Sequence, residues 1–330
     1  MLKVKKLFLN FITLSMFWLS LLTALVVIFS AIAPNSDAIL TIKYILFALP
    51  RYWFIFICIL LAMLWSRLTT LKKYSLPLIF AVSVYYLDFQ MNINTDTKNT
   101  TNLPSFTLVT ANLGEGVELS RLASLIKYYN PDAFVFQEAT NLKNFKVFDG
   151  YPFKDCKGNL CFISKHKFKK VNFLGNSLFN GYGDLAAFYE LNINNSNVNL
   201  ANVHFPTVRR AFSDPSSLDI VHANRVISAS LLSEWAEIKT NAIIAGDFNM
   251  TVTDNLYRRN FNRFQNVITD FGFGFNNTFD FNYRGLSVPG VRIDHILLSK
   301  SFNIEQATTL DNLGGDHRPV LSKFTLNISK

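Results

Sequence analysis

The stretch IIAGDFNMTVTD, residues 243–254, places a carboxylate and an amide at the end of an apolar run. Four uncharged residues lead into Asp247, and Asn249 follows two positions later. Because strand side chains alternate between faces with a period of two, Asp247 and Asn249 are predicted to point the same way. An ordinary turn rich in Asp and Asn after a strand has the same local pattern. The ends of the other strands must therefore distinguish a turn from a functional site.

Side chains that can bind metal or phosphate recur at the ends of other predicted strands. A single buried carboxylate is usually a paired structural charge, and a lone histidine is usually a core residue. Six such strand ends in one chain favour a shared site instead. Besides Asp247 and Asn249, they carry Asn112, Gln137-Glu138, His204, Asp294-His295 and Asp316-His317.

This set of side chains suits phosphoester hydrolysis. Phosphodiesters repel anionic nucleophiles, so the site needs a hard cation and donors around the phosphoryl oxygens. Oxygen ligands such as Glu138 and Asp316 suit Mg²⁺, an aspartate can orient or deprotonate water, and histidines can stabilise charge or protonate a leaving oxygen. Zinc would require more nitrogen or sulfur ligands, and the sequence has no H-E-x-x-H motif.

The periodicity after residue 105 predicts many short strands and a few long helices. Strands are expected at SFTLVTANLG, DAFVFQEA, LCFISK, KVNFLG, LAAFYELNI, VNLANVHF, AIIAGDF, RIDHILLSK and VLSKFTLN, and helices at VELSRLASLIKYYN and about 217–239. This order predicts an α+β sandwich, with two packed, mainly antiparallel sheets flanked by helices. The strict β-α alternation that a TIM barrel needs is missing.

Residues 1–89 are predicted to form a transmembrane region of about three helices, at 8–32, 44–65 and 74–89. The first apolar run, 7–33, is long enough for a span of about 20 residues. A cleaved signal peptide is the alternative, because Ala31-Ile32-Ala33 resembles a cleavage site, although its apolar region should span only about 7–15 residues. Pro50-Arg51 interrupts the second run, and the third run is short.

Basic residues predict the orientation of these spans. Residues 1–88 hold 8 Lys/Arg and 2 Asp/Glu, so most of the net charge of +9 lies there. Arg67, Lys72 and Lys73 fall between the second and third runs, which places that loop and the N-terminus in the cytoplasm. Three spans then deliver the remainder outside the cytoplasm, whereas two uncleaved spans would return it to the cytoplasm.

A polar, aperiodic stretch at 90–105 predicts a linker, followed by one domain at 106–330. Cys58 lies in an apolar run and is expected to be a packing residue. Cys156 and Cys161 flank the turn-like KGNL and are too few for a zinc site. Outside the cytoplasm they could form a disulfide; two free thiols are the alternative.

The ordered motifs TANLG, QE, NVHF, GDFN, RIDHIL and GDHRPV resemble those of the endonuclease/exonuclease/phosphatase superfamily, over about residues 106–328. The N-terminal spans resemble those of bacterial membrane-anchored members, which implies a multi-pass protein of the bacterial inner membrane. The final motif has Gly315 where serine often precedes the Asp-His pair, and this departure leaves both groups intact.

The resemblance implies a role for each matched residue. Asn112, Glu138 and Asp316 correspond to the metal site, with Glu138 as the principal Mg²⁺ ligand and Mn²⁺ as a possible substitute. Asp247 corresponds to the aspartate that positions or deprotonates the attacking water, and Asn249 to the residue beside it that holds phosphate or water. These assignments agree with the chemistry expected from the residue types.

The resemblance also covers Asp294, His317 and His204. Asp294 corresponds to a carboxylate that orients a histidine, and His317 to either a base or an imidazolium that binds the phosphoryl oxygen. His204 matches the nuclease, sphingomyelinase and phosphatase branches, whereas apurinic-site enzymes carry tyrosine there.

The sequence therefore predicts a membrane-anchored, Mg²⁺-dependent phosphodiester hydrolase, with the bilayer contacted through the N-terminal helices. Nucleic acid and phospholipid-like substrates both remain open. Arg209, Arg210, Arg225 and Arg318 could contact phosphates or be surface charges. The alternative function is a non-catalytic membrane-anchored binding or scaffold protein with the same fold.

Overall fold

The computed structural model describes residues 2–33, 36–49, 51–92, 104–114, 116–139, 142, 146–175, 177 and 183–326. The chain forms two compact units. The helical unit comprises Met1–Phe89 with Pro289–Val291, and the sandwich unit comprises Gln90–Val288 with Arg292–Lys330.

The helical unit contains four α-helices and one short 3-10 helix among its described residues: α1 (Leu2–Ile32), α2 (Asp37–Ala48), α3 (Tyr52–Met63), η1 (Trp65–Arg67) and α4 (Thr70–Tyr86). Its apolar interior includes Phe17, Phe54, Leu61 and Ile79. Cys58 is buried in the same cluster, which confirms the packing role expected for it.

One helix among the described residues, Val4–Ile32, is long and apolar enough to cross a membrane by itself. The predicted second span is divided, because α2 ends at Ala48 and Leu49 is extended, as expected for a residue before proline. The bent pair α2 and α3 passes the same test if counted as one span. The predicted third span corresponds to α4, which has 17 residues and contains Pro77.

Two six-stranded sheets form the centre of the sandwich unit. One sheet has the order β15-β16-β2-β3-β5-β4 and the other β10-β14-β9-β8-β7-β6. Parallel pairing occurs between β2 and β3 and between β8 and β9, and the other described pairs within these sheets are antiparallel. The predicted α+β sandwich with mainly antiparallel sheets is confirmed.

The strands of the first sheet are β15 (Phe302–Thr309), β16 (Val320–Leu326), β2 (Phe106–Asn112), β3 (Ala133–Gln137), β5 (Leu160–Ser164) and β4 (Phe153–Lys157). Those of the second are β10 (Gln265–Asn266), β14 (Asp294–Leu298), β9 (Ala242–Asp247), β8 (Ser196–His204), β7 (Ala186–Ile193) and β6 (Phe168–Leu174). Short ladders join β1 (Gln90–Met91) to β11 (Phe273–Gly274) and β12 (Asp280–Tyr283) to β13 (Leu286–Pro289).

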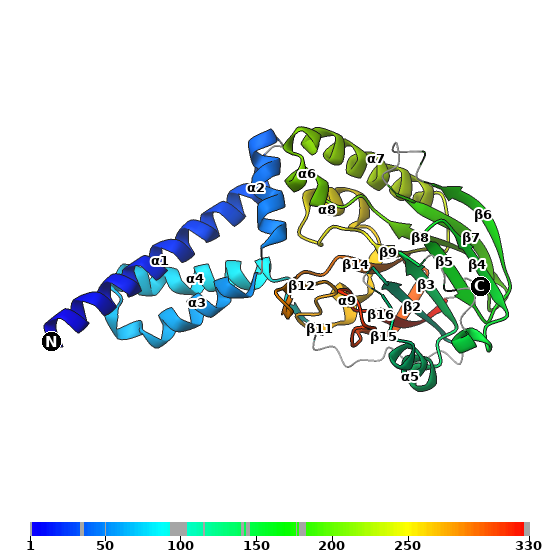
Figure 1. Cartoon of the computed structure of the whole chain (residues 1–330), viewed down its shortest axis with the longest axis horizontal. Helices are drawn as coiled ribbons and strands as arrows, with labels where there is room; N and C mark the ends of the chain where they lie inside the picture. The colour runs from blue at the N-terminus through cyan, green and yellow to red at the C-terminus, as the bar shows by residue number, and fades with distance from the viewer. Residues whose placement is uncertain are drawn as a thin grey trace. The chain divides into compact units, whose positions relative to one another are not determined.

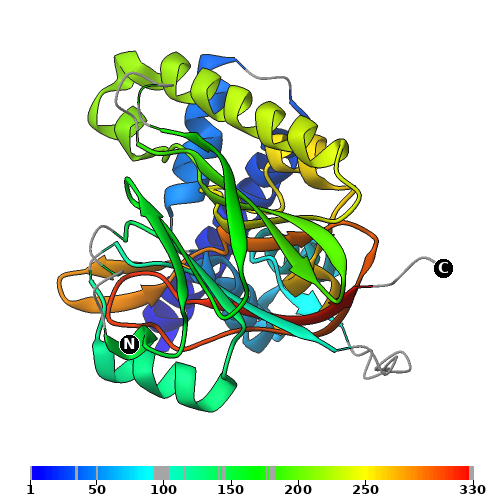
Figure 2. The same ribbon diagram turned by 90° about the vertical axis from the view of Figure 1, so that its right-hand side faces the viewer.

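Helices cover the outer faces of both sheets, with α7 (Leu218–Glu237) on one side and α5 (Leu119–Tyr129) on the other (Figures 1 and 2). Residues such as Val135, Leu200 and Ile243 fill the layer between the sheets. Leu232 of α7 packs on the second sheet, and Leu122 of α5 packs on the first. Other short helices among the described residues are η3 (Lys146–Phe148), α6 (Arg209–Ser213), η5 (Pro215–Ser217), α8 (Asn255–Phe261) and α9 (Val267–Phe271).

The region predicted as a linker begins inside the sandwich unit. Gln90 and Met91 pair with Gly274 and Phe273, and Asn92 donates a hydrogen bond to the Thr269 carbonyl. Residues 93–103 lie outside the described residues. Cys156 and Cys161 face each other across the β4–β5 hairpin and form a disulfide, the first of the two predicted alternatives.

Candidate active site

The register of three neighbouring strands brings predicted site residues into one row. Asp247 is the last residue of β9, and it pairs with His204 on β8 and with Asp294 on β14. On the first sheet, Asn112 ends β2 beside Gln137, so that Glu138 follows directly at the end of β3. The strand ends of the two sheets therefore supply one site, because Asn112 of the first sheet reaches Asp247 of the second.

Asp247 is buried and accepts three hydrogen bonds from amide groups. Its Oδ1 accepts the Asn249 backbone N–H at 2.7 Å, and its Oδ2 accepts Asn112 Nδ2 at 3.0 Å and Asn249 Nδ2 at 3.2 Å. Asn249 has a positive φ of 48° and also donates to the Phe205 carbonyl. The stretch is thus a tight turn whose hydrogen bonds fix the carboxylate at the strand end.

Asp294 and His317 form a buried pair. His317 Nδ1 lies 2.9 Å from Asp294 Oδ2, and Thr278 Oγ1 accepts the backbone N–H of Asp294 at 3.0 Å. Burial by itself lowers the pKa of His317, but the carboxylates of Asp294, Asp247 and Asp316 raise this pKa to about 9. The arrangement therefore favours an imidazolium that is oriented by Asp294.

Three side-chain oxygens converge beside Gly114. A Cβ built on this glycine would lie 3.0 Å from Glu138 Oε2, 3.4 Å from Asp316 Oδ1 and 3.5 Å from Asn112 Oδ1. Glu138 itself has a positive φ of 54°, a strained conformation for a residue that is not glycine. Two carboxylates and one amide oxygen around a small space are a donor set that fits Mg²⁺.

A second group of potential ligands consists of Asp247, Asp294 and His317, whose ligand atoms lie within 4.8 Å of one another. Asp294 Oδ2 already pairs with His317, and both oxygens of Asp247 accept amide hydrogen bonds. These bonds compete with metal coordination. The cation cradle beside Gly114, formed by Glu138, Asp316 and Asn112, offers three oxygen ligands, whereas this second group offers two oxygens and one nitrogen. The cradle therefore suits Mg²⁺ better.

His204 lies between the two groups. Its Nε2 is 3.6 Å from Glu138 Oε1 and 3.7 Å from Asp247 Oδ2. The structure thus brings together all eight residues predicted for the site. One contact cluster contains Asn112, Glu138, His204, Asp247 and Asn249, and a second contains Asp294, Asp316 and His317. The strand pairing of Asp294 with Asp247 places the two clusters side by side.

The four arginines considered as phosphate contacts occupy different environments. Arg225 is buried and donates to the carbonyls of Pro206 and Asn249, so it positions loops instead of meeting substrate. Arg318 donates two hydrogen bonds to Asp280 Oδ2. Arg209 and Arg210 are both exposed on α6.

Three contributors to the site were not among the predicted site residues, although one of them, Gly114, is the last residue of the motif TANLG. Thr278 accepts two backbone N–H groups, from Ile293 and Asp294. Phe279 packs against His317 with ring centroids 5.1 Å apart. Gly114 leaves the space on which the oxygens converge.

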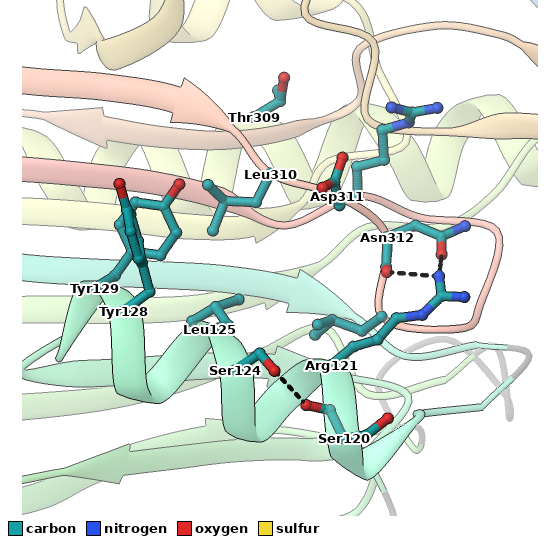
Figure 3. Close-up of a pocket in the computed structure, with 12 residues that line it drawn as sticks. Ser120, Arg121, Ser124, Leu125, Tyr128, Tyr129, Thr309, Leu310, Asp311 and Asn312 are labelled. Atoms are coloured by element: carbon teal, nitrogen blue, oxygen red, sulfur yellow. Dashed lines mark hydrogen bonds between the residues drawn. The ribbon is translucent and has the colours of Figure 1, made fainter.

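A groove of about 880 Å³ lies between α5 and the segment 309–313. Figure 3 shows Tyr128 and Tyr129 together on α5, and Arg121 bonded to Asn312 farther along the groove. Arg318, which follows His317 directly in the chain, also lines it, but none of the eight predicted site residues does. The groove is therefore a separate feature of the described surface.

The sequence profile of the Endonuclease/Exonuclease/phosphatase family matches residues 109–317. The fold, the site and this match indicate a phosphoric ester hydrolase. The chain belongs to the endonuclease/exonuclease/phosphatase family. No curated protein sequence matches it.

Solved structures with the same fold share little sequence with this chain. The 3' phosphatase NExo from Neisseria, bound to product DNA hairpin, is 17% identical with a TM-score of 0.52, covering 66% of this chain and 98% of its own. D. rerio TDP2 complexed with single strand DNA product is 15% identical with a TM-score of 0.52, covering 67% and 99%. An endonuclease/exonuclease/phosphatase from Beutenbergia cavernae is 15% identical with a TM-score of 0.50, covering 67% and 72%.

Proposed function

We propose that this protein is a membrane-anchored, Mg²⁺-dependent hydrolase of phosphodiester bonds. The observation that carries the proposal is the continuous contact network from Asn112 through Asp247 to Glu138 and His204. The buried carboxylate of Asp247, the exposed carboxylate of Glu138 and the imidazole of His204, all at strand ends, are the kinds of group that phosphoester hydrolysis requires.

Asp247 is the residue that positions the attacking water or accepts its proton. Its two amide donors from Asn249 and one from Asn112 restrain the carboxylate, so its orientation is fixed before substrate enters. A preorganised group of this kind reduces the entropic cost of reaching the transition state.

His317 contributes positive charge next to the reacting phosphate. The raised pKa of about 9 favours its protonated form near neutral pH, and Asp294 holds the ring through Nδ1. Of the two roles open for this residue, we favour the imidazolium that stabilises a phosphoryl oxygen. The role that we assign to His204 is protonation of the leaving oxygen.

Glu138, Asp316 and Asn112 would hold Mg²⁺ beside Gly114. A bound Mg²⁺ supplies Lewis-acid stabilisation of charge on the phosphoryl oxygens. Mn²⁺, which also accepts oxygen ligands, is expected to substitute for it.

Two observations bear on the class of substrate: the ligands of structural neighbours and the proposed membrane attachment. Two structural neighbours are bound to DNA products, which supports a nucleic-acid substrate, whereas attachment to a bilayer equally suits a phospholipid-like diester. The N-terminal helix Val4–Ile32 supports membrane attachment. We further propose a multi-pass arrangement in the bacterial inner membrane, with the sandwich unit outside the cytoplasm.

The test is hydrolysis by the purified full-length protein with plasmid DNA, RNA, sphingomyelin and an aryl phosphodiester, with and without Mg²⁺. Glu138→Gln and Asp247→Asn should each lower turnover by at least about 10²–10⁴-fold, the usual cost of losing a positioned acid–base or metal group. EDTA should abolish wild-type activity, and Mg²⁺ should restore it.

Thermal melting of each variant must show that it is folded. A folded Glu138→Gln protein with wild-type, EDTA-insensitive activity would refute the metal mechanism. A wild-type protein inactive on every substrate class, yet folded, would favour the alternative of a binding or scaffold protein.

A further inference from the structure

Arg209 reaches the candidate active site from α6, five residues after His204 in the chain. Its Nη2 lies 3.4 Å from Asp316 Oδ2, although its side chain is 68% exposed. The guanidinium carbon is 5.3 Å from the centroid of the Phe279 ring, and that ring is 5.1 Å from the His317 ring. Arg209 and His317 therefore contact the same phenyl ring.

Asp316 joins Arg209 to the proposed cation cradle. Its Oδ2 faces Arg209, while its Oδ1 lies 3.4 Å from the Cβ position of Gly114, where Glu138 Oε2 also converges. Only the carboxylate group of Asp316 thus separates the Arg209 guanidinium from the cradle. A phosphate bound between the cradle and His317 would lie within reach of the guanidinium.

The environment of Arg209 differs from that of the two arginines with structural roles. Arg225 is 1% exposed and donates to two backbone carbonyls, and Arg318 is paired with Asp280 through two hydrogen bonds. Arg209 has one contact of 3.4 Å with a carboxylate, made by a group with five N–H donors. A planar guanidinium at the edge of a site is well suited to bidentate contact with phosphate oxygens.

We propose that Arg209 is a substrate-binding residue that contacts a non-bridging oxygen of the substrate phosphate. The inference rests on the proposed function, because it assumes that a phosphate ester occupies this site. It adds a substrate-binding group that lies outside the sequence motifs of the strand ends. The ligand chemistry is an anionic phosphate, shared by nucleic acid and phospholipid-like diesters.

A purely structural role for Arg209 makes a different prediction. If Arg209 only oriented Asp316, its removal would raise the Mg²⁺ concentration for half-maximal activity and lower kcat, with KM unchanged. If Arg209 binds substrate, KM rises, while kcat and the Mg²⁺ requirement change little.

The experiment compares Arg209→Gln, Arg209→Lys and the matched control Arg210→Gln in the full-length protein. Arg210 is the next residue of the same exposed helix, and successive helical residues point in different directions. The control therefore removes the same charge without removing the side chain beside Asp316. Kinetics use an aryl phosphodiester, and inorganic phosphate serves as the competing ligand.

We expect Arg209→Gln to lower kcat/KM by about 10- to 100-fold, mostly through KM, as for the loss of one charge-assisted hydrogen bond. Inhibition by inorganic phosphate should weaken by a similar factor, and the salt dependence of kcat/KM should become shallower. Arg209→Lys should have an intermediate kcat/KM, because lysine keeps the positive charge but lacks the planar guanidinium that can contact two oxygens. Arg210→Gln should resemble wild type.

Two results would overturn the inference: Arg209→Gln kinetics equal to those of Arg210→Gln, or a loss confined to kcat and the Mg²⁺ requirement. If wild type hydrolyses no ester, the proposed function fails separately. In that case the increase in Tm caused by inorganic phosphate still tests whether Arg209 binds phosphate. This increase should be smaller in Arg209→Gln than in Arg210→Gln, and equal increases would exclude phosphate binding by Arg209.

Discussion

Asp294 and His295 show how adjacent residues acquire opposite roles. Asp294 pairs with His317 at the site, whereas His295 points to the other face of β14, where its Nε2 lies 2.8 Å from the Met250 carbonyl. Its Nδ1 lies 3.1 Å from Asn266 Nδ2. His295 is therefore a satisfied core histidine, the commoner role for such a residue.

The buried His295 should make folding stability depend on pH. Burial, with Arg292 adding to it, lowers the pKa of His295 from 6.5 to about 3, so the folded state keeps the ring neutral. Below pH 6.5 the unfolded chain binds the proton first. The stability that His295 contributes is thus complete above about pH 6.5 and is lost towards pH 3, at up to about 1.4 kcal/mol per pH unit.

Unfolding of wild type and His295→Gln, measured across this pH range, checks the prediction. The variant is expected to be less stable at pH 8, and the difference in the free energy of unfolding should narrow as the pH falls below 6.5. A difference that stays constant with pH would contradict a neutral buried histidine.

At the scale of elements, β9 depends on a glycine directly before Asp247. Gly246 has a φ of +149°, and a Cβ at this position would lie 2.0 Å from the carbonyl oxygen of Val203 on the paired strand β8. The close approach of β8 and β9 places His204 next to Asp247. Gly246 therefore links strand packing to the geometry of the site.

Gly246→Ala should destabilise the sandwich unit by more than the roughly 1–3 kcal/mol typical of backbone strain alone, because the clash is with backbone. Gly150→Ala is the matched control, since a Cβ there meets no atom within 4 Å, and it should change stability by less than about 0.5 kcal/mol. Thermal or urea unfolding measures both. Equal stabilities of the two variants would show that the β8–β9 spacing is adaptable.

Element prediction succeeded where periodicity was strong. The helix expected at about 217–239 is α7 (Leu218–Glu237), and the predicted strands around Asp247 and Asp294 are β9 and β14. Sequence reasoning missed β15, whose exposed and half-buried residues give no alternating pattern, and it missed the β12–β13 hairpin. Such elements at the edge of a sheet are stabilised by pairing with neighbouring strands. They therefore need no alternating hydrophobic pattern that the sequence would reveal.

At the scale of the whole molecule, the disulfide and the charge distribution both bear on the proposed extracytoplasmic placement of the sandwich unit. The structure joins Cys156 and Cys161, and disulfides persist where the surroundings are oxidising. The concentration of basic residues before residue 89 favours the same side for the sandwich unit. The two observations are independent because one concerns local pairing and the other concerns the spans.

Reporter fusions after residue 100 should therefore be active only as extracytoplasmic reporters. Thiol alkylation in native membranes should find Cys156 and Cys161 protected until a reductant is added. Activity of a cytoplasm-only reporter at this position would refute the topology. It would also indicate that an even number of spans precedes the sandwich unit.

The sequence by itself determined the apolar N-terminal region, the two-sheet fold and the eight residues proposed for the site. Strand periodicity and polar strand ends such as Asp247 are local patterns, so they can be read along one chain. Only the tertiary structure decided that His317 faces Asp294, that Gly114 leaves room for three oxygens, and that Arg209 lies beside Asp316 while Arg225 is buried. These contacts join residues distant in sequence, and their geometry depends on strand register and on packing between sheets, which no local pattern encodes.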